Sequence, residues 1–288
     1  MVANFSEIEA EIEDRWAEVY DQIYVQRLPH KGLLHDFQQY VYDQLLTRCD
    51  TPRSPEMLDV RLLDAGCGTG ALLELFHQNS KWKLAGIDLS TKMVNIAKQK
   101  CPDADFTIGT FESLPQNTEK FDVIIGSEWL HHVPDLKPIF DQAYVLLKPG
   151  GLFCVVEPSK DWLFEQVGIR QAMLTLIVGP LLKCLSFLRN REIQTIKDIE
   201  GDRGYNPWHR HLSVSEVSAA IDRNKFEVHL SVKNTIAPYF SGVLFGGWFD
   251  NAVYRTLKML DRLFADRMNR GAYIFITAIR KKRGELSQ

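Results

Sequence analysis

Features that mark secreted, metal-binding or nucleic-acid-binding proteins are scarce in this sequence. Its five cysteines lie far apart and no two form a CxxC pair. This spacing argues against a disulfide framework or a zinc knuckle and favours a reducing, cytoplasmic setting. The formal net charge is −3 at pH 7, whereas proteins that hold phosphate backbones usually carry a strongly basic face. We therefore expect no metal site and no nucleic-acid partner.

Long hydrophobic runs, internal repeats and a secretion signal are missing as well. The first residues, MVANFSEIEAEIED, are acidic and lack the basic-then-apolar order of a signal peptide. An uncharged apolar run at 171–182 is too short to cross a bilayer and contains Gly179 and Pro180. The sequence predicts a protein without a membrane span, for which contact with a membrane surface stays open.

What the sequence does contain is the pattern of an α/β protein. Its 288 residues, 45% hydrophobic and 25% charged, can fill one large domain or two small ones. Apolar residues recur at helical spacing over 8–23, where Ser6 and Glu9 resemble a capping box, and over 34–45, after Gly32. A linker with two prolines at 50–55 then separates a predicted N-terminal helical cap, 1–50, from a main domain, 56–288.

Short apolar runs separated by helical patterns fill the first part of the main domain. Runs of this kind are typical of a parallel sheet that is covered on both sides. Two further strand-like runs, 226–232 and 272–279, are separated by a long helical stretch. We predict an open, doubly wound α/β sheet. The first five runs are Val60–Leu63, Leu84–Ile87, Phe106–Ile108, Phe121–Ile125 and Leu152–Val156.

The first predicted strand ends in a glycine-rich turn, LLDAGCGTG at 62–70, that passes directly into a helical pattern. Gly66, Gly68 and Gly70 suit such a turn, because backbone without a Cβ can bend sharply and approach a ligand closely. Asp88 ends the next strand, at the distance expected of an acid that hydrogen-bonds ribose hydroxyls. Both S-adenosylmethionine (SAM) and NAD carry such a ribose, and Gly66, Gly68 and Ala71 also satisfy the dinucleotide pattern GxGxxA.

Four successive motifs resemble those of class I SAM-dependent methyltransferases: LLDAGCGTG, GIDLSTKMVNIAK, FDVIIGSEWLHHVPD and LLKPGG. The pattern, over about residues 60–157, is similar to that of the group that includes the ubiquinone- and menaquinone-biosynthesis methyltransferases. The resemblance implies a Rossmann-like, mostly parallel seven-stranded sheet with an antiparallel last strand, which nicotinamide dehydrogenases lack. It also implies SAM as the cofactor and S-adenosylhomocysteine as its product.

The resemblance further implies which residues hold SAM. Tyr20 or Tyr24 resembles an N-terminal tyrosine that reaches the SAM carboxylate, with ordinary core packing of the helix as an equal alternative. Ser127 would face the sulfonium. The other expected contacts, from the methionine part through the ribose to the adenine, are Asp64, Gly66, Gly68, Gly70, Asp88, Leu89, Met93, Thr110 and Phe111.

Thr110 departs from the family pattern. Gly-Asp-Ala commonly follows the third strand, with the aspartate accepting the adenine amino group, whereas this chain has Gly109, Thr110 and Phe111. A threonine hydroxyl can accept one hydrogen bond, but without the assistance of a charge. Three consequences stay open: weaker SAM binding, an acid supplied from elsewhere, or a protein that binds SAM without turning it over.

Histidines near the predicted sheet edge are the candidate general bases for methyl transfer to a hydroxyl or an activated carbon. His132, which follows His131 after the fourth strand, matches a histidine of many family members. The alternative is that His132 has a purely structural role. His209 and His211 fall in a polar-aromatic loop where no cysteine or acid completes a metal-ligand set. Glu157, at the end of the fifth strand, is a weaker base candidate that we expect to point into the same cleft.

Two apolar segments are expected as helical insertions, at about 160–212 and 237–268. They either line a pocket for a hydrophobic acceptor or pack on each other as a cap core or dimer seam. We expect O- or C-methylation of a small-to-medium, fairly apolar acceptor (quinone-like, lipid or natural product) by a monomer or homodimer. The alternatives are a non-catalytic SAM-binding regulatory protein and, with less support, an NAD-dependent oxidoreductase.

Overall fold

Seven strands form one sheet in the order β3-β2-β1-β4-β5-β7-β6. The computed structural model describes residues 5–25, 28–47, 59–161, 210–233, 255–256, 258–261 and 271–282. Only β7 runs antiparallel to its neighbours, so the predicted doubly wound sheet with an antiparallel last strand is confirmed. The strands are β1 (Arg61–Ala65), β2 (Lys83–Asp88), β3 (Asp105–Ile108), β4 (Phe121–Ser127), β5 (Leu147–Pro158), β6 (Phe226–Lys233) and β7 (Tyr273–Arg280).

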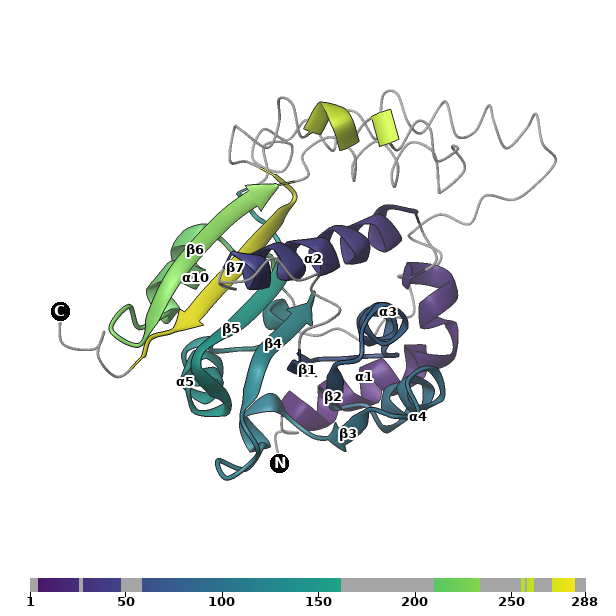
Figure 1. Cartoon of the computed structure of the whole chain (residues 1–288). Coiled ribbons are helices and arrows are strands. Elements are labelled where there is room, and N and C mark those ends of the chain that lie inside the picture. Colours follow the sequence, from purple (N-terminus) through teal and green to yellow (C-terminus); the bar gives the residue numbers. More distant parts are fainter. Residues whose placement is uncertain are drawn as a thin grey trace.

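Helices cover both faces of this sheet (Figure 1). Because successive strand side chains point to opposite faces, Leu62 enters one hydrophobic core and Leu63 the other. The core on the Leu62 side contains α2 (Leu28–Leu46) and α3 (Ala71–Asn79), and the other contains α5 (Lys137–Leu146) and α10 (Val214–Ala220). The strands are therefore buried on both sides, which explains their continuous apolar runs.

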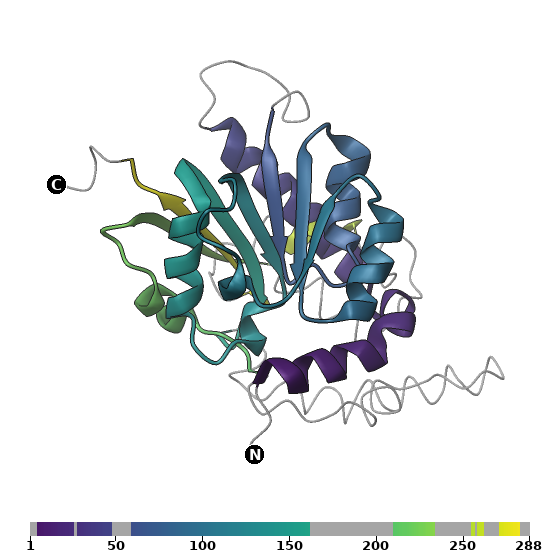
Figure 2. The same ribbon diagram turned by 90° about the horizontal axis from the view of Figure 1, so that it is seen from below.

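The order of the strands reverses between β1 and β4, which pair side by side. In open α/β sheets the crevice at the carboxyl ends of such strands is the usual place for a ligand. α1 (Phe5–Tyr20) lies across this edge of the sheet, as Figure 2 shows, and continues into a short π-helical turn, Asp21–Val25. α4 (Thr91–Lys100) follows β2 and contacts α1.

The two N-terminal helices differ in position. α1 borders the crevice, whereas α2 packs Leu33, Phe37 and Val41 into a sheet core, where all three are fully or almost fully buried. α2 also begins at Leu28 rather than after Gly32 as the pattern predicted. Pro29 is compatible with this earlier start, because proline fits the first turn of a helix, where its missing N–H has no intrahelical acceptor.

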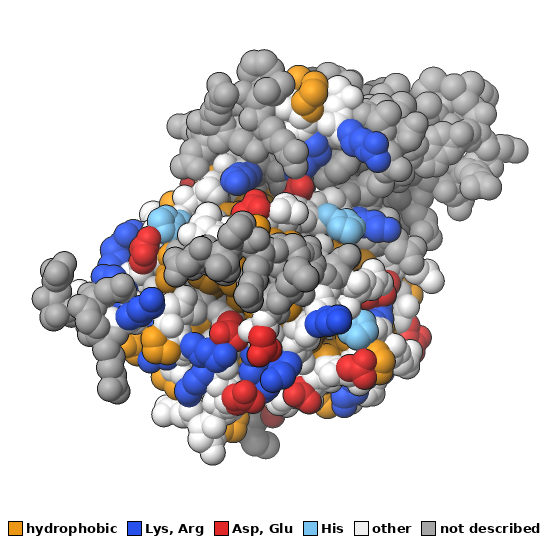
Figure 3. Space-filling model, viewed as in Figure 1, with side chains coloured by type: hydrophobic (Ala, Val, Ile, Leu, Met, Phe, Trp, Pro, Cys, Tyr) orange, Lys and Arg blue, Asp and Glu red, His pale blue; other side chains and the backbone are white. Residues whose placement is uncertain are grey.

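Within the described residues, no helix is both long and apolar enough to cross a membrane. On the face drawn in Figure 3, lysine and arginine side chains are interspersed with aspartate and glutamate side chains instead of gathering by sign. This mixture agrees with the small net charge of −3. The predicted insertions at 160–212 and 237–268 lie almost wholly outside the described residues.

Candidate active site

The glycine-rich turn at the end of β1 presents bare backbone to the crevice. Gly66, Gly68 and Gly70 have φ angles of 69°, 50° and 76°, in the left-handed region that glycine adopts without a steric cost. A Cβ on Gly66 would lie 2.6 Å from Cβ of Trp129, whereas a Cβ on Gly68 would meet nothing within 4 Å. Gly66 is therefore required by packing, and Gly68 leaves an open space against the backbone.

Asp88, at the end of β2, is held by this turn. One carboxylate oxygen accepts a hydrogen bond from the Gly68 N–H at 2.8 Å, and the other accepts one from the Ser90 N–H at 2.9 Å. Burial raises the pKa of Asp88, although both hydrogen bonds oppose the shift. The carboxylate is thus fixed beside the glycine turn with its position set before any ligand arrives.

A cavity of about 360 Å³ opens over the turn and Asp88. This volume lies within the usual range of small-molecule sites. A second hollow of about 40 Å³ shares Tyr20, Gly66, Gly68 and Ser127 with it and also contacts Asp64. The main cavity is lined by Ser6, Glu9, Glu13, Tyr20, Gly66, Gly68, Ile87, Asp88, Leu89, Met93, Gly109, Thr110, Phe111, Glu112, Ser127, Glu128, Trp129, His132, Val133, Pro134, Asp135 and Pro138.

Most of the residues expected to hold a cofactor meet at these two hollows. Gly70 lines neither; a Cβ there would lie 2.9 Å from Cβ of Ala97, so its role is to let α3 and α4 approach. Tyr24 lies in the π-helical turn, but its side chain is outside the described residues. The expected residues that line one or both hollows are Tyr20, Asp64, Gly66, Gly68, Asp88, Leu89, Met93, Thr110, Phe111 and Ser127.

Two buried polar atoms at the small hollow have no hydrogen-bond partner among the described residues: Asp64 Oδ2 and Ser127 Oγ. Asp64 is 1% exposed, and burial raises its pKa well above the usual value, with a further contribution from Asp88. Buried polar groups in folded proteins are normally paired. The two atoms therefore fit a ligand that brings its own polar groups to this end of the site.

Thr110 lies on the wall of the cavity, but its hydroxyl also has a local task. Thr110 Oγ1 accepts a hydrogen bond from the Ser113 N–H at 3.2 Å and so caps the short 3₁₀ helix Phe111–Ser113. Glu112, in that helix, is exposed and lines the same cavity. The described part of the site thus contains an acid close to the position where the family pattern has aspartate.

Glu157 organises the turn after β4 and does not face the cavity. It is completely buried, and it accepts hydrogen bonds from the N–H groups of Trp129 at 2.9 Å, Leu130 at 2.7 Å and His131 at 3.3 Å. Glu157 Oε2 also lies 2.7 Å from His131 Nδ1. Burial raises the pKa of Glu157 to about 8 and lowers that of His131. The expectation that Glu157 points into the cleft is wrong, because its oxygens are turned toward this backbone.

The backbone at the end of β4 is strained where it turns into the cavity. Glu128 has a φ of 55°, the one positive value among the described non-glycine residues, and its N–H donates to the Val156 carbonyl at 2.9 Å. Such conformations persist where the surrounding structure enforces them, often at functional sites. The strain, with the Glu157 hydrogen bonds, brings Trp129 over the glycine turn and turns His132 toward α1.

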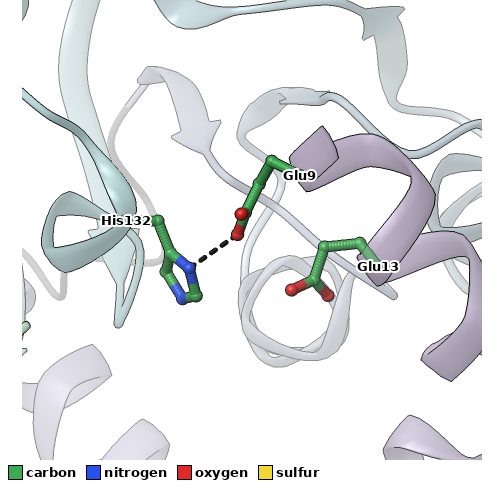
Figure 4. A group of neighbouring side chains, drawn as sticks. All are labelled: Glu9, Glu13 and His132. Carbon is green, nitrogen blue, oxygen red and sulfur yellow. Dashed lines mark ion pairs between the residues drawn. The ribbon is translucent and has the colours of Figure 1, made fainter. Parts of the chain in front are cut away.

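His132 meets two carboxylates of α1 at the cavity wall (Figure 4). Its Nδ1 lies 2.6 Å from Glu9 Oε1, and Glu9 is only 5% exposed. Glu13 lies beside this pair: one carboxylate oxygen of each glutamate and one ring nitrogen of His132 all lie within 4.8 Å of one another. The capping-box expectation for Ser6 and Glu9 is therefore wrong: α1 already begins at Phe5, and the Glu9 carboxylate binds His132.

The described part of the chain does not place His209 or His211 at the cavity beside His132. His209 lies outside the described residues. His211 is partly buried and does not line the cavity. Its neighbour Arg210 donates its N–H to the His131 carbonyl at 3.3 Å, which holds Arg210 beside the turn after β4.

Sequence reasoning missed Glu9, Glu13 and Trp129. Glu9 was interpreted as a capping-box acid and Glu13 as an ordinary polar position, because nothing local to α1 indicates what lies across the crevice. Trp129 could have been suspected, since a bulky residue just after the end of β4 follows Gly126 and lies near Gly66 of the glycine turn. A Cβ on Gly126 would meet its ring nitrogen at 2.0 Å, so these glycines make room for the indole.

The family comparison covers half of the chain. Residues 58–204 match the model of a methyltransferase domain. The chain is also 33% identical over 132 residues to a ubiquinone biosynthesis O-methyltransferase of Brucella anthropi, covering 42% of this chain and 53% of that protein. The same-named protein of Nitrobacter winogradskyi is 27% identical over 169 residues, with coverages of 57% and 56%. The matches thus span about half the length of these curated relatives.

Solved methyltransferase structures share the fold, and their alignments cover nearly the whole chain. The plantazolicin methyltransferase BpumL, in complex with a pentazolic desmethylPZN analog and SAH, superposes with a TM-score of 0.57 at 16% identity, covering 96% of this chain and 97% of that one. A possible histamine N-methyltransferase of Thermotoga maritima gives 0.51 at 16% identity, covering 96% and 100%. The resemblance inferred from the four sequence motifs is confirmed.

Proposed function

Because this chain belongs to the methyltransferase-domain family, we propose that it transfers the methyl group of SAM to an oxygen or carbon atom of a small-to-medium, fairly apolar acceptor. A quinone-like, lipid or natural-product scaffold fits this description. The observation that carries the proposal is the Gly68–Asp88 hydrogen bond, because it fixes the acid that would bind the ribose in a cavity that His132 also lines.

SAM would extend from the large cavity into the small hollow. Its ribose hydroxyls would donate to Asp88, and its adenine would pack between Leu89, Met93 and Phe111. The methionine part would lie over Gly66 and Gly68, where its ammonium group would meet the unpaired Asp64 oxygen. When bound, this cofactor supplies an electrophilic methyl group on a cationic sulfur.

The acceptor would lie between Trp129, Pro134 and His132, at the other end of the cavity. His132 would act as the general base: it takes the proton of a hydroxyl, or of the carbon being methylated, as the new bond to the methyl forms and the carbon–sulfur bond breaks. Exclusion of water by Trp129 and α1 would keep the aligned geometry that contributes much of the rate. The insertions at 160–212 and 237–268 remain a prediction for the rest of the acceptor pocket.

A transfer assay tests this function directly. The purified chain is incubated with SAM carrying a tritiated methyl group and a panel of phenols, catechols, hydroxyquinones and primary amines. We expect label in an oxygen or carbon product together with an equal amount of S-adenosylhomocysteine. Label in the amines alone would overturn the proposed acceptor atom.

The rivals give different outcomes. S-adenosylhomocysteine that binds tightly while no acceptor is labelled would favour a regulatory SAM-binding protein. Binding of NAD in place of S-adenosylhomocysteine would favour an oxidoreductase.

A further inference from the structure

We propose that Glu9 is a positioning residue that completes a carboxylate–histidine pair with His132, so that the general base is assembled only while α1 lies over the cofactor cavity. The inference rests on the proposed function for the role of His132. It adds a part of the N-terminal helix to a site whose other residues come from the sheet edge.

The contact itself carries the first step. The Glu9 carboxylate is 2.6 Å from His132 Nδ1, and the two side chains are 7% and 24% exposed. A carboxylate can only accept a hydrogen bond, so Nδ1 must carry the proton. The neutral imidazole then has its lone pair on Nε2, which points away from Glu9 in Figure 4. A histidine fixed in this tautomer is oriented to accept a proton from a group in the cavity.

α1 is anchored to the cofactor half of the site by further acids, which carries the second step. Asp14 accepts from Ser90 Oγ at 2.5 Å and from the Lys92 N–H at 3.1 Å, directly after Asp88 in the chain. Asp21 accepts from Thr69 Oγ1 at 2.6 Å, in the glycine turn. α1 and the π-helical turn that continues it therefore contact the glycine turn, the start of α4 and His132. These contacts hold α1 in the position in which Glu9 meets His132.

Several charged groups face His132 besides Glu9. Glu13 approaches from α1, Glu157 from β5, and the His131 ring lies 4.1 Å from the His132 ring, centroid to centroid. Asp88 at the end of β2 also interacts with it. Burial alone would lower the pKa of His132, but the hydrogen bond to Glu9 and the surrounding carboxylates outweigh it and raise the pKa.

Glu9, Glu13 and His132 also resemble a set of ligands for one cation. Two atoms bound to the same ion at about 2.1 Å would lie roughly 3 Å apart or more. The Nδ1–Oε1 distance of 2.6 Å is shorter and is typical of a charge-assisted hydrogen bond. The geometry therefore favours a proton, rather than a metal ion, between His132 Nδ1 and the Glu9 carboxylate. Cation binding becomes an outcome of the test.

The test uses nitrogen-15 NMR of the full chain saturated with S-adenosylhomocysteine, in which the His132 signals are identified by their loss in His132→Gln. We expect Nδ1 protonation and a pKa above the ordinary 6.5 in the unaltered protein. Glu9→Gln should lower the His132 pKa by roughly one unit, a tenfold change in proton affinity, because a buried opposite charge is removed. Glu11→Gln, an exposed acid of the same helix that pairs with Arg15, is the matched control and should leave the titration unchanged.

Turnover with an acceptor found in the transfer assay gives the second readout. Glu9→Gln should lower kcat about tenfold or more with little change in KM for SAM. The rise of activity with pH should also occur at a lower pH, because the pKa of His132 is lower in this variant. Glu9→Asp should recover part of the loss. In a His132→Gln background, Glu9→Gln should have no further effect.

The outcomes separate this inference from the proposed function. If the chain fails to bind S-adenosylhomocysteine, the proposed function fails. If it binds and the His132 titration is the same in Glu9→Gln, the role of Glu9 is wrong. Stoichiometric Mg²⁺ or Zn²⁺ binding that removes the Nδ1 proton in the unaltered protein and is lost in Glu13→Gln would also overturn the pair.

Discussion

The two ends of the cavity are built in different ways. At the cofactor end, the glycine turn and Asp88 come from neighbouring parallel strands, and their groups include main-chain N–H groups fixed by hydrogen bonds. At the acceptor end, Glu9 and His132 come from elements far apart in the chain and meet through side chains. The first end depends on local backbone geometry, and the second depends on how α1 docks. A change in the glycine turn should damage the first end, whereas removal of the Glu9 charge should affect only the second.

Gly66→Ala should have the largest effect, because Gly66 supports both ends. The new Cβ would meet Trp129 at 2.6 Å and would be held at a φ of 69°. Overpacking and a left-handed conformation for alanine together cost about 3 kcal/mol of unfolding free energy. Urea unfolding followed by circular dichroism measures it. A loss below about 1 kcal/mol would show that the turn can relax and that the two ends are not joined at this residue.

Glu157→Gln should damage the acceptor end more than the cofactor end. Above the Glu157 pKa of about 8, where the side chain is a carboxylate, both of its oxygens accept, whereas the NH₂ of a glutamine can accept from none of these donors. We expect a loss of about 2 kcal/mol of unfolding free energy, since buried donors lose their acceptor. Affinity for S-adenosylhomocysteine, measured in the folded protein, should change by no more than about threefold. A larger loss of affinity would mean that the turn after β4 also supports the nucleotide.

Gly68→Ala should separate folding from binding at the cofactor end. No atom lies within 4 Å of the added Cβ, so only the φ of 50° opposes the change, at a cost of about 1 kcal/mol. The methyl group would, however, occupy the space in which the ligand approaches the backbone. Calorimetric titration should show S-adenosylhomocysteine binding weakened by about tenfold or more. Unchanged affinity would place the ligand elsewhere.

Thr110→Asp should give the smallest effect and should improve the cofactor end. Aspartate is also a good helix N-cap, so it can keep the hydrogen bond to the Ser113 N–H while it offers a charged acceptor to the adenine amino group. We expect S-adenosylhomocysteine to bind about fivefold more tightly. Thr110→Val, which removes the cap without adding a charge, is the control. Weaker binding of the aspartate variant would show that Glu112 already accepts this bond.

The same contrast explains what could be predicted from the sequence. The strands, the order LLDAGCGTG–Asp88 and the cofactor residues could be predicted, because buried parallel strands and tight turns leave local patterns. The role of Glu9 could not, because its spacing from Ser6 matches a capping box and its partner, His132, lies on a distant element. Glu157 was placed wrongly for a related reason: a strand-end acid can face the crevice or the backbone beside it, and local sequence does not distinguish these. The start of α2 at Leu28 was missed because Gly32 looked like a helix boundary.

Isothermal titration of the purified chain with S-adenosylhomocysteine and with NAD, compared with an Asp88→Asn variant, tests the central claim most directly. Asparagine keeps the size of the side chain but removes the charge that receives the ribose hydroxyls. The account predicts micromolar binding of S-adenosylhomocysteine, no binding of NAD, and an affinity about 50-fold lower in the variant, which corresponds to the loss of a hydrogen bond to a charged group. Binding of NAD, or equal affinity of the two proteins for S-adenosylhomocysteine, would contradict it.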